Sequence, residues 1–377
     1  MKKKVAILGA TGSIGSSTLD VVEQNQDLFE VVLLSAHKDA EGLRRIALRY
    51  PKAVLALSSE GASDSTISYR GEAGLLRAIE DVGADIVVNG IAGSAGLKPS
   101  ITAVKTGCQL ALANKETIVM AAPIVFALAK AHSSTIIPVD SEHSAIFHLL
   151  QAHGHDSVEE LLLTASGGPF RGFTSQQLER VTVQDALAHP TWKMGGKITI
   201  DSASLANKGL EVIEAVRLFN VPPERVTVVV HPQSLVHSMI RVTDGSVYAQ
   251  MSRPDMRVPI HNALHWPHTL PCPFGRLTFD SLLLTFDKPD TKAFPMLPLA
   301  YEAARLSACY PTAYLAADEV AVDAFLRGEI TFLQIADITH RVLDDDWSMD
   351  GENLESVLSA DHRARKRAQA TLREIRL

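Results

Sequence analysis

Residues 5–15, Val-Ala-Ile-Leu-Gly-Ala-Thr-Gly-Ser-Ile-Gly, decide the fold of this chain. The apolar run at 5–8 predicts a buried parallel strand, and the amphipathic segment that ends near Gln24 predicts a helix. Gly9, Gly12 and Gly15 allow a tight turn between them and leave helix N–H groups facing a pyrophosphate. The spacing is GxxGxxG and not the strict GxGxxG, so a purely structural turn is the alternative. Because the glycines lie between a strand and a helix, we favour a nucleotide-binding Rossmann unit.

The end of the second predicted strand, at 31–35, indicates which dinucleotide binds. An NAD site usually has an acidic residue at this position, which holds the ribose 2′-hydroxyl. This chain has Ala36, His37 and Lys38 instead, a small and cationic set that suits the 2′-phosphate of NADP(H). Asp39 would partly neutralise such a site, and a solvated loop is the alternative for His37 and Lys38.

Polar residues follow three later strands that we predict at 86–89, 110–113 and 135–139. The loop 90–96 has residues small enough for its backbone to lie against a cofactor, although a flexible connector would look the same. Asn114, Lys115 and Glu116 follow the second of these strands. Three polar side chains at the carboxyl end of a parallel strand indicate a ligand site.

Two carboxylates, Asp140 and Glu142, follow the last of these strands. Oxygen ligands so arranged suit a hard divalent cation such as Mg²⁺ or Mn²⁺, with a third carboxylate required from elsewhere. The alternative is a helix start, in which Asp140 or Ser141 is the N-cap and Glu142 lies near the positive end of the helix dipole.

The segment 189–211 has a composition that is hard to explain as scaffold. Trp192 lies among Pro, Lys, Met and Gly, which is typical of a flap that closes over a substrate. Ser202, Asn207 and Lys208 are donors suited to a phosphate. Glu211, which we expect to begin a helix at 211–219, is a candidate third metal ligand. A helix-start carboxylate and a surface ion pair with Lys208 are the alternatives.

The centre of the chain also predicts a small sheet and a second anion site. Ser166, Gly167 and Gly168 form a turn that could present a hydroxyl and consecutive N–H groups to an anion, or could be a simple turn. Apolar strands at 236–241 and 246–251, joined by a turn at Asp244 and Gly245, indicate a mixed, partly antiparallel sheet.

The composition is that of a globular protein, with 46% hydrophobic and 21% charged residues. A net charge of −7 argues against a dedicated nucleic-acid binder. No run approaches ~18 apolar residues, so we expect no membrane span. Three cysteines without metal-type spacing predict a reducing compartment, the cytoplasm, and no disulfides.

The predicted fold class is α/β, with a Rossmann-like parallel sheet, a central α+β catalytic domain and a C-terminal α-helical bundle. We expect four regions: an NADPH-binding domain at 1–134, a metal- and substrate-binding domain at 135–266, a linker at 267–295, and a helical bundle at 296–377.

Eight motifs recur in order along nearly the whole chain: GATGSIG, NGIAGSAGL, ALANKET, PVDSEHSAIF, TASGGPFR, HPTWKMGGKITIDSASLANKGLE, HPQSLVHS and RPDMRVPI. In these motifs the chain resembles the 1-deoxy-D-xylulose 5-phosphate reductoisomerases, NADPH-dependent enzymes of the methylerythritol phosphate route to isoprenoids. The resemblance implies a metal-dependent rearrangement of that phosphorylated sugar and its reduction to 2-C-methyl-D-erythritol 4-phosphate. It also implies a homodimer and a divalent cation, Mg²⁺ or Mn²⁺, with Co²⁺ as a further candidate.

The resemblance further implies a role for each matching residue. The metal would be bound by Asp140, Glu142 and Glu211. NADPH would contact Thr11, Gly12, Ser13, Ile14, Ala36, His37, Lys38, Asn114, Glu116 and Gly195. The substrate would contact Lys115, Ser141, Glu142, Ser166, His189, Ser202, Asn207, Lys208 and Glu211. Glu142 and Lys115 are candidates for proton transfer, and His189 and Trp192 complete the catalytic set, with Trp192 in the flap.

Four positions depart from the family pattern. His37 and Asp39 replace the usual Gly and Asn, which puts the contacts to the adenosine end in doubt. Leu315 and Asp318 replace two Asn residues in the helical domain.

Two other functions stay open. An aspartate-semialdehyde-type dehydrogenase would need a cysteine nucleophile, for which Cys108, ahead of a strand, is poorly placed. A non-catalytic NADP-sensing protein would need no converging carboxylates.

Overall fold

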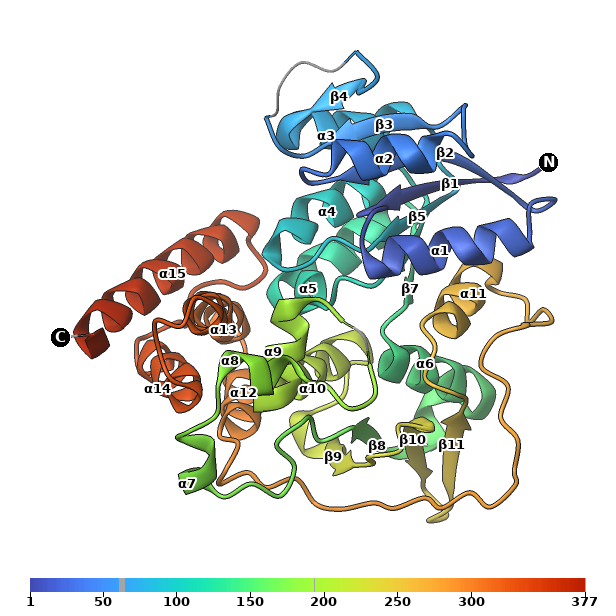
Figure 1. Cartoon of the computed structure of the whole chain (residues 1–377). Coiled ribbons are helices and arrows are strands. Elements are labelled where there is room, and N and C mark those ends of the chain that lie inside the picture. Colours follow the sequence, from blue (N-terminus) through green and yellow to red (C-terminus); the bar gives the residue numbers. More distant parts are fainter. Residues whose placement is uncertain (61–64, 193, 377) are drawn as a thin grey trace. The chain divides into compact units, whose positions relative to one another are not determined.

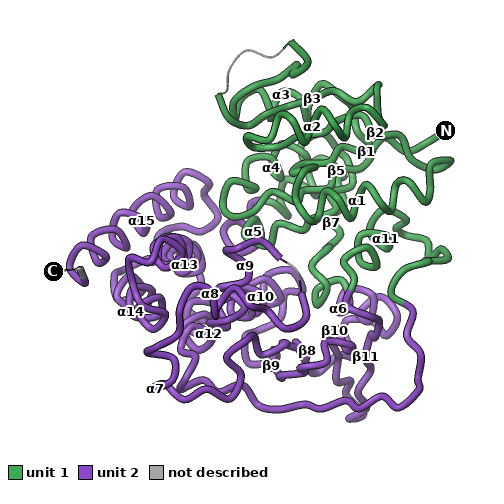
Figure 2. The backbone as a smooth tube through the Cα atoms, in the orientation of Figure 1, with its two compact units in different colours: residues 1–117, 125–144, 255–275 green, residues 118–124, 145–254, 276–377 purple. Residues whose placement is uncertain are grey.

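The structure is a computed structural model that describes residues 1–60, 65–192 and 194–376. The chain forms two compact units, and each unit gathers separate stretches of the sequence (Figure 2). Unit 1 comprises Met1–Thr117, Val125–Ser144 and Asp255–Gly275, and unit 2 comprises Ile118–Ile124, Ala145–Pro254 and Arg276–Leu377.

Unit 1 is built on a seven-stranded sheet in the order β4-β3-β2-β1-β5-β6-β7, with parallel pairing between all neighbouring strands (Figure 1). The order reverses beside β1, so the boundary between β1 and β5 is the switch point at which such sheets bind ligands. The strands are β1 Lys3–Leu8, β2 Phe29–Ala36, β3 Val54–Leu57, β4 Tyr69–Arg70, β5 Ile86–Asn89, β6 Gln109–Leu112 and β7 Thr135–Pro138.

Helices flank this sheet because right-handed crossovers place each connecting helix on one of its faces. Helix α1 packs against α11, and α3 packs against α4. The helices are α1 Ser13–Gln24, α2 Ala40–Ala47, α3 Gly71–Asp81, η1 Ser94–Gly96, α4 Leu97–Lys105 and α11 Arg257–His265. Two further helices, α5 Lys115–Ala131 and α6 Ser141–His153, contribute residues to both units.

Helix α5 is kinked at Ala121, next to Pro123. Proline has no N–H, so the carbonyl of Val119 loses its ordinary helical donor. Within unit 2, Arg217 replaces that donor: its Nη1 donates to Val119 O at 2.9 Å and its Nη2 to Ala308 O at 3.2 Å. Burial lowers the pKa of the Arg217 guanidinium to about 10.

Unit 2 combines a four-stranded sheet, in the order β11-β10-β8-β9, with a set of helices. Strand β10 is antiparallel to β8 and β11, while β8 and β9 are parallel, so the predicted mixed sheet is confirmed. The strands are β8 Val158–Ala165, β9 Val226–Val230, β10 Val236–Val242 and β11 Val247–Met251. The helices are η2 His155–Ser157, α7 Ser175–Leu178, α8 Val183–Leu187, α9 Gly196–Ser204, α10 Ala206–Leu218, η3 Pro223–Arg225, α12 Met296–Leu306, α13 Tyr310–Leu326, α14 Phe332–Leu343 and α15 Leu354–Arg376.

Helix α13 is the centre of the helical region, since it packs against α9, α12, α14 and α15. It is apolar on almost all sides, as a helix surrounded by others must be. The predicted fold class is therefore confirmed: a parallel sheet, a mixed sheet and a C-terminal group of helices.

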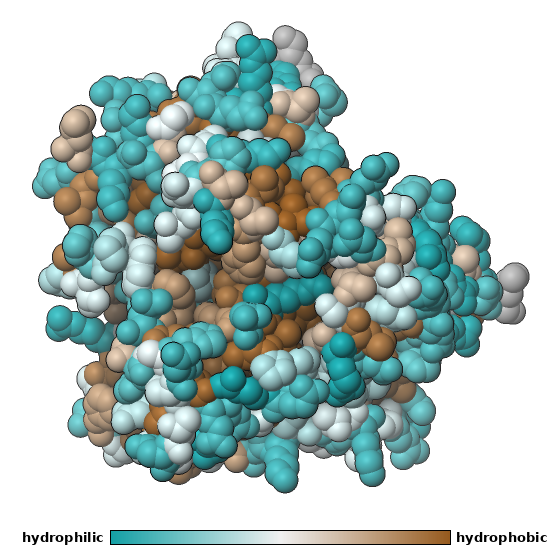
Figure 3. Space-filling view, turned by 180° about the vertical axis from the view of Figure 1, so that it is seen from behind, coloured by the Kyte–Doolittle hydropathy of each residue, from teal (hydrophilic) through white to brown (hydrophobic). Residues whose placement is uncertain are grey.

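The surface is mixed in character. Figure 3 shows a face on which hydrophilic residues predominate and hydrophobic residues lie between them. Across the described ranges, no helix combines the length and apolarity needed to cross a bilayer.

Candidate functional site

The glycine loops that follow β1 and β5 meet at the switch point of unit 1. Gly9 has a φ of +80°, and a Cβ there would lie 2.9 Å from the carbonyl oxygen of Gly90. A Cβ on Gly15 would lie 2.4 Å from the carbonyl oxygen of Gly9. The first turn of α1 has no side-chain cap, and Thr11, Gly12 and Ser13 before and at its start are exposed. These features make a cradle in which helix N–H groups can bind a pyrophosphate.

The end of β2 presents a histidine and a lysine to solvent. Ala36 is buried, His37 and Lys38 are exposed, and His37 Nδ1 lies 2.9 Å from Ser58 Oγ. Asp39 is the N-cap of α2, where its carboxylate accepts the N–H of Gly42 at 2.8 Å. Its negative charge is thus directed at the positive end of that helix.

Asn114 and Glu116 hold the loop 90–96 in place. The buried Asn114 Nδ2 lies 2.8 Å from the carbonyl oxygens of Ile91 and Gly93 and from Glu116 Oε2. Glu116 Oε1 accepts the N–H of Gly93 at 3.2 Å. The flexible-connector interpretation of this loop is therefore wrong.

Asn89 also holds the loop 90–96 in place, and this role was not predicted from the sequence. It is fully buried, donates to Gly96 O and to Ser100 Oγ, and accepts the N–H of Ile91. The available signal was a polar residue at the end of an otherwise apolar strand.

The carboxyl ends of the neighbouring strands β6 and β7 bring Lys115 and Asp140 together. Lys115 Nζ and Asp140 Oδ2 form an ion pair in which both side chains are largely buried, at 7% and 11% exposure. Asp140 is also the N-cap of α6, because its carbonyl accepts the N–H of Ser144 at 2.8 Å. Ser141 Oγ donates to Glu142 Oε2. The alternative of a helix start is thus correct in that Asp140 is the N-cap of α6. The side chain of Asp140 also pairs with Lys115.

Glu211 corrects one expectation. Helix α10 begins at Ala206, so Glu211 lies in its second turn, at 1% exposure, and the helix-start interpretation is wrong. Asn207 Nδ2 donates to Glu211 Oε1 at 2.5 Å, and Lys208 Nζ donates to Oε2. The pair with Lys208 exists, but it is buried and not on the surface, since Lys208 is only 4% exposed.

The misplaced helix start has a structural cause. Leu205, at a φ of +61°, joins α9 directly to α10. Gly209 lies inside α10, where a Cβ would come within 2.6 Å of Ala300 Cβ on α12.

Ser166 and His189 form a hydrogen-bonded pair in unit 2. His189 Nδ1 accepts the N–H groups of Thr191 and Trp192 at 3.1 and 2.9 Å, so the imidazole proton lies on Nε2. His189 Nε2 is 3.1 Å from Ser166 Oγ, which leaves the serine hydroxyl proton available to a ligand. Burial lowers the pKa of the His189 imidazole, which favours this neutral form.

The turn after Ser166 packs directly against the helix that carries Ser202. Gly167 and Gly168 have φ values of +83° and +65°, and a Cβ on Gly168 would lie 2.7 Å from Ser202 O. Trp192 and Ser202 are half-buried, Gly195 is the exposed N-cap of α9, and Lys193 of the predicted flap lies outside the described residues.

Two histidines of the HPQSLVHS motif were quoted without a role. His231 is fully buried, with Nδ1 2.9 Å from Thr285 O and Nε2 accepting the N–H of Leu235, which fixes a neutral tautomer. His237 Nε2 lies 2.8 Å from Ser252 Oγ, and burial lowers its pKa to about 4.

Cys108 does not have the properties of a nucleophile. It is 5% exposed, its thiol donates to Ala103 O at 3.2 Å, and burial raises its pKa. A catalytic thiol needs the opposite environment, so the dehydrogenase alternative loses its nucleophile.

Comparison with protein families gives three consecutive matches. Residues 5–122 match the family described as 1-deoxy-D-xylulose 5-phosphate reductoisomerase, residues 136–219 match the C-terminal domain of that reductoisomerase, and residues 251–367 match the DXP reductoisomerase C-terminal domain.

Individual relatives agree over the full length. The chain is 47% identical over 372 residues to the 1-deoxy-D-xylulose 5-phosphate reductoisomerase of Treponema denticola, covering 98% of this chain and 97% of the relative. A solved DOX-P reductoisomerase in complex with NADPH, fosmidomycin and magnesium matches with a TM-score of 0.94 and 37% identity over 99% of each chain. The Zymomonas mobilis reductoisomerase in complex with NADPH matches with a TM-score of 0.91 and 39% identity, again over 99% of each chain.

Proposed function

Because the chain belongs to the 1-deoxy-D-xylulose 5-phosphate reductoisomerase family, we propose how its own residues divide that reaction among them. The chain is an NADPH-dependent enzyme that rearranges and reduces 1-deoxy-D-xylulose 5-phosphate to 2-C-methyl-D-erythritol 4-phosphate, a step in isoprenoid precursor synthesis. The observation that carries the residue assignment is the placement of Lys115 and Asp140 at adjacent strand ends of the sheet whose switch point holds the glycine cradle.

The cofactor site follows from the cradle. We assign the pyrophosphate to Thr11, Gly12, Ser13 and Ile14 at the start of α1, and the 2′-phosphate to the exposed His37 and Lys38 beside Ala36. Asn114 and Glu116 act mainly by shaping the loop 90–96 against the cofactor, since their polar atoms bond to that loop. Gly195 would contact the cofactor from the base of the flap. NADPH supplies the hydride in the reduction.

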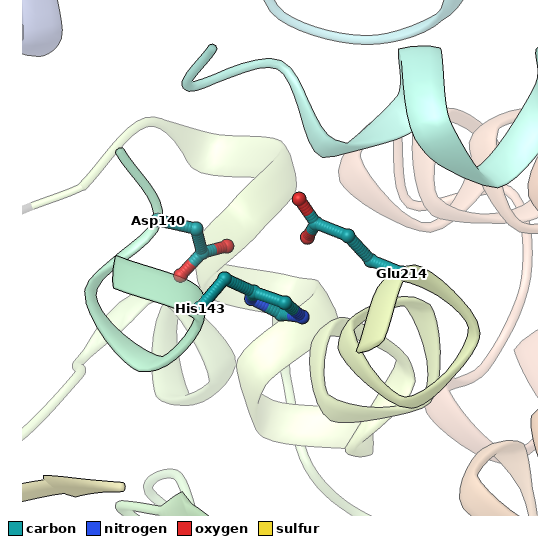
Figure 4. Close-up of side chains that lie close together, drawn as sticks. All are labelled: Asp140, His143 and Glu214. Atoms are coloured by element: carbon teal, nitrogen blue, oxygen red, sulfur yellow. The ribbon is translucent and has the colours of Figure 1, made fainter. Parts of the chain in front are cut away.

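The metal assignment is Asp140, Glu142 and Glu211. Three carboxylates suit Mg²⁺, Mn²⁺ or Co²⁺, and Lys115 and Lys208 balance the charges of Asp140 and Glu211, with which they pair. A second set that includes Asp140 consists of His143 and Glu214, drawn with it in Figure 4. We prefer the first set because a hard cation favours oxygen over imidazole nitrogen. A bound cation would polarise the ketone and the adjacent hydroxyl of the substrate.

The substrate assignment uses hydrogen-bond donors of the matching motifs. Ser166, Ser202, Asn207 and Lys208 would bind the phosphate, and His189 fixes the hydroxyl of Ser166 so that it donates outward. Lys115 and Ser141 would contact the reacting end, where Lys115 and Glu142 are the candidates for proton transfer. Trp192 would cover the substrate and exclude water.

The decisive experiment is a coupled assay. NADPH absorbance should fall when 1-deoxy-D-xylulose 5-phosphate and Mn²⁺ are added, and it should stay constant in excess chelator. Turnover at full rate without any divalent cation would contradict the metal assignment. Binding of NADPH without any turnover in the complete assay would favour a non-catalytic sensor.

We further propose a homodimer in the cytoplasm. Phe279 and Leu283, in the linker, are 76% and 72% exposed, and the edge strand β11 exposes Val247 and Tyr248. Exposed apolar residues and an unpaired strand edge are suited to burial by a second copy of the chain. All three cysteines are free thiols, as a reducing compartment would maintain them. Light scattering should give twice the chain mass, and Leu283→Asp should weaken the association.

A further inference from the structure

A buried ionic cluster joins helix α9 to helix α13 in unit 2. Lys197, in the first turn of α9, places its Nζ 2.5 Å from Asp201 Oδ2 and 2.8 Å from Asp318 Oδ2. Asp201 lies one turn further along α9, whereas Asp318 lies on α13. One ammonium group therefore bridges carboxylates on two different helices.

Burying these charged side chains costs free energy of folding. The side chains of Asp318 and Asp201 are 0% and 3% exposed, and that of Lys197 is 25% exposed. Burial raises the pKa of the Asp318 carboxyl, and Lys197 opposes that rise. Apolar side chains of similar volume often stabilise a core at least as well as a buried ionic group does. Stability alone therefore explains the arrangement poorly, and a specific position of α9 is the better explanation.

Helix α9 carries proposed site residues at both of its ends. Gly195 is its N-cap, Trp192 of the flap precedes it by three residues, and Ser202 lies near its C-terminus. Thr199 ties the first turn to Gly195, because its hydroxyl donates to Gly195 O at 2.8 Å. A shift of the first turn would move the base of the flap and Ser202 together.

The two glycines at the start of α9 lie in open space. A Cβ on Gly195 would have nothing within 4 Å, and a Cβ on Gly196 would come no closer than 3.9 Å to Leu326. Since these glycines bring no side chain to α13, the contact from Lys197 to Asp318 gives the first turn a directional, polar attachment to that helix.

We propose that Lys197 and Asp318 are positioning residues, which anchor the first turn of α9 to α13 and thereby hold Ser202 and the base of the flap in place for the substrate. The inference rests on the proposed roles of Ser202 and the flap, and it assigns roles to two residues outside the proposed substrate and cofactor sets.

The test compares Lys197→Met with Arg365→Met. Arg365 is a matched control, since it joins α13 to α15 through Glu319 and Asp361 and its side chain is 26% exposed. Lys197→Met should lower kcat/KM for 1-deoxy-D-xylulose 5-phosphate at least 10-fold and raise KM, with partial recovery in Lys197→Arg. Arg365→Met should lose comparable thermal stability and keep kcat/KM within 2-fold. The proposal would be overturned if Lys197→Met and Arg365→Met lost the same thermal stability and also the same fraction of kcat/KM.

A double variant separates position from stability. In Lys197→Met, two buried carboxylates lose the lysine, and the added Asp318→Leu removes the more buried of them, so the double variant should regain part of the thermal stability while kcat/KM stays at least 10-fold low. Recovery of both quantities would mean that the cluster is only structural.

Hydrogen exchange measures the anchor without substrate. Amides of 196–204 should exchange at least 10-fold faster in Lys197→Met than in the wild type, and at the wild-type rate in Arg365→Met. Unchanged exchange in Lys197→Met would refute the anchor even if the double variant does not fold. A wild-type chain that shows this anchor but no turnover would instead contradict the proposed function.

Discussion

The substitution Glu211→Gln tests whether Glu211 is a metal ligand or only a structural carboxylate. The substitution keeps the shape of the side chain and removes its charge. In the structure, one carboxylate oxygen accepts from Asn207 Nδ2 at 2.5 Å and the other from Lys208 Nζ. The amide oxygen of Gln can replace one of these acceptors, whereas its NH₂ group would face a donor. The variant therefore loses one hydrogen bond and one ionic attraction, and it creates no cavity.

The burial of the pair sets the cost to stability. Glu211 and Lys208 are 1% and 4% exposed, and removal of one partner of a buried ion pair costs about 3–5 kcal/mol. The amide oxygen that remains recovers part of this loss, because a hydrogen bond to a charged group contributes about 1.5–3 kcal/mol. We expect a net loss of about 2 kcal/mol, which leaves the chain folded at 25 °C. The effect on the metal should be larger, since even partners outside the coordination shell change metal affinity about 10–100-fold.

Glu214→Gln is the matched control. Glu214 lies one turn further along α10, is also 1% exposed, and belongs to the alternative ligand set with His143. Titration of NADPH oxidation with Mn²⁺ should show at least a ~100-fold higher requirement in Glu211→Gln, and a nearly unchanged one in Glu214→Gln. The reverse result would assign the metal to His143 and Glu214. Equal losses in both variants, in proportion to their unfolding in urea, would show that both carboxylates are structural.

Three further predictions concern stability, pH and the rejected alternative. Arg217→Met leaves Val119 O without a donor and should reduce the free energy of unfolding by about 2–4 kcal/mol in urea, whereas the exposed control Arg305→Met should change it by less than ~0.5 kcal/mol. His237 has a pKa of about 4 in the folded chain and about 6.5 when exposed, so the unfolded chain binds its proton first. Stability should therefore fall by up to roughly 3 kcal/mol as the pH drops from 6.5 to 4, and His237→Gln should flatten this part of the profile. Cys108→Ser should keep kcat within about 2-fold, because the serine hydroxyl can also donate to Ala103 O; a loss of about three orders of magnitude would restore the cysteine-dependent alternative.

Local rules of sequence were sufficient for most of the parallel sheet of unit 1. Alternating strands and helices with glycines at Gly9 and Gly15 predict a parallel sheet, and the polar residues after each strand mark its carboxyl edge. The ion pair between Lys115 and Asp140 follows from that topology, because their strands are neighbours. The interpretation of Asp39 as a neutralising charge omitted its local role as the N-cap of α2.

Unit 2 was less predictable because its site depends on tertiary packing. Gly209 lies inside α10, where the close approach of α12 requires a residue without a side chain. Helix α10 begins at Ala206, so Glu211 is buried in its second turn and does not begin the helix. The partners of His189 and His231 are similarly remote in sequence or lie in irregular backbone, so no periodic pattern indicates them.

The lysines beside the proposed metal ligands resolve a conflict in the chemistry of the site. Carboxylates that share one cation site repel one another, and burial such as that of Glu211 disfavours uncompensated charge. Lys115 pairs with Asp140, and Lys208 pairs with Glu211, so each lysine balances one carboxylate charge within its own unit. Both lysines are also assigned to a phosphorylated substrate, whose negative charge they can bind when a cation takes over the carboxylates. Each lysine therefore balances a carboxylate in the protein without ligands and binds the substrate in the loaded enzyme. Replacing either lysine by a neutral residue removes both functions at once.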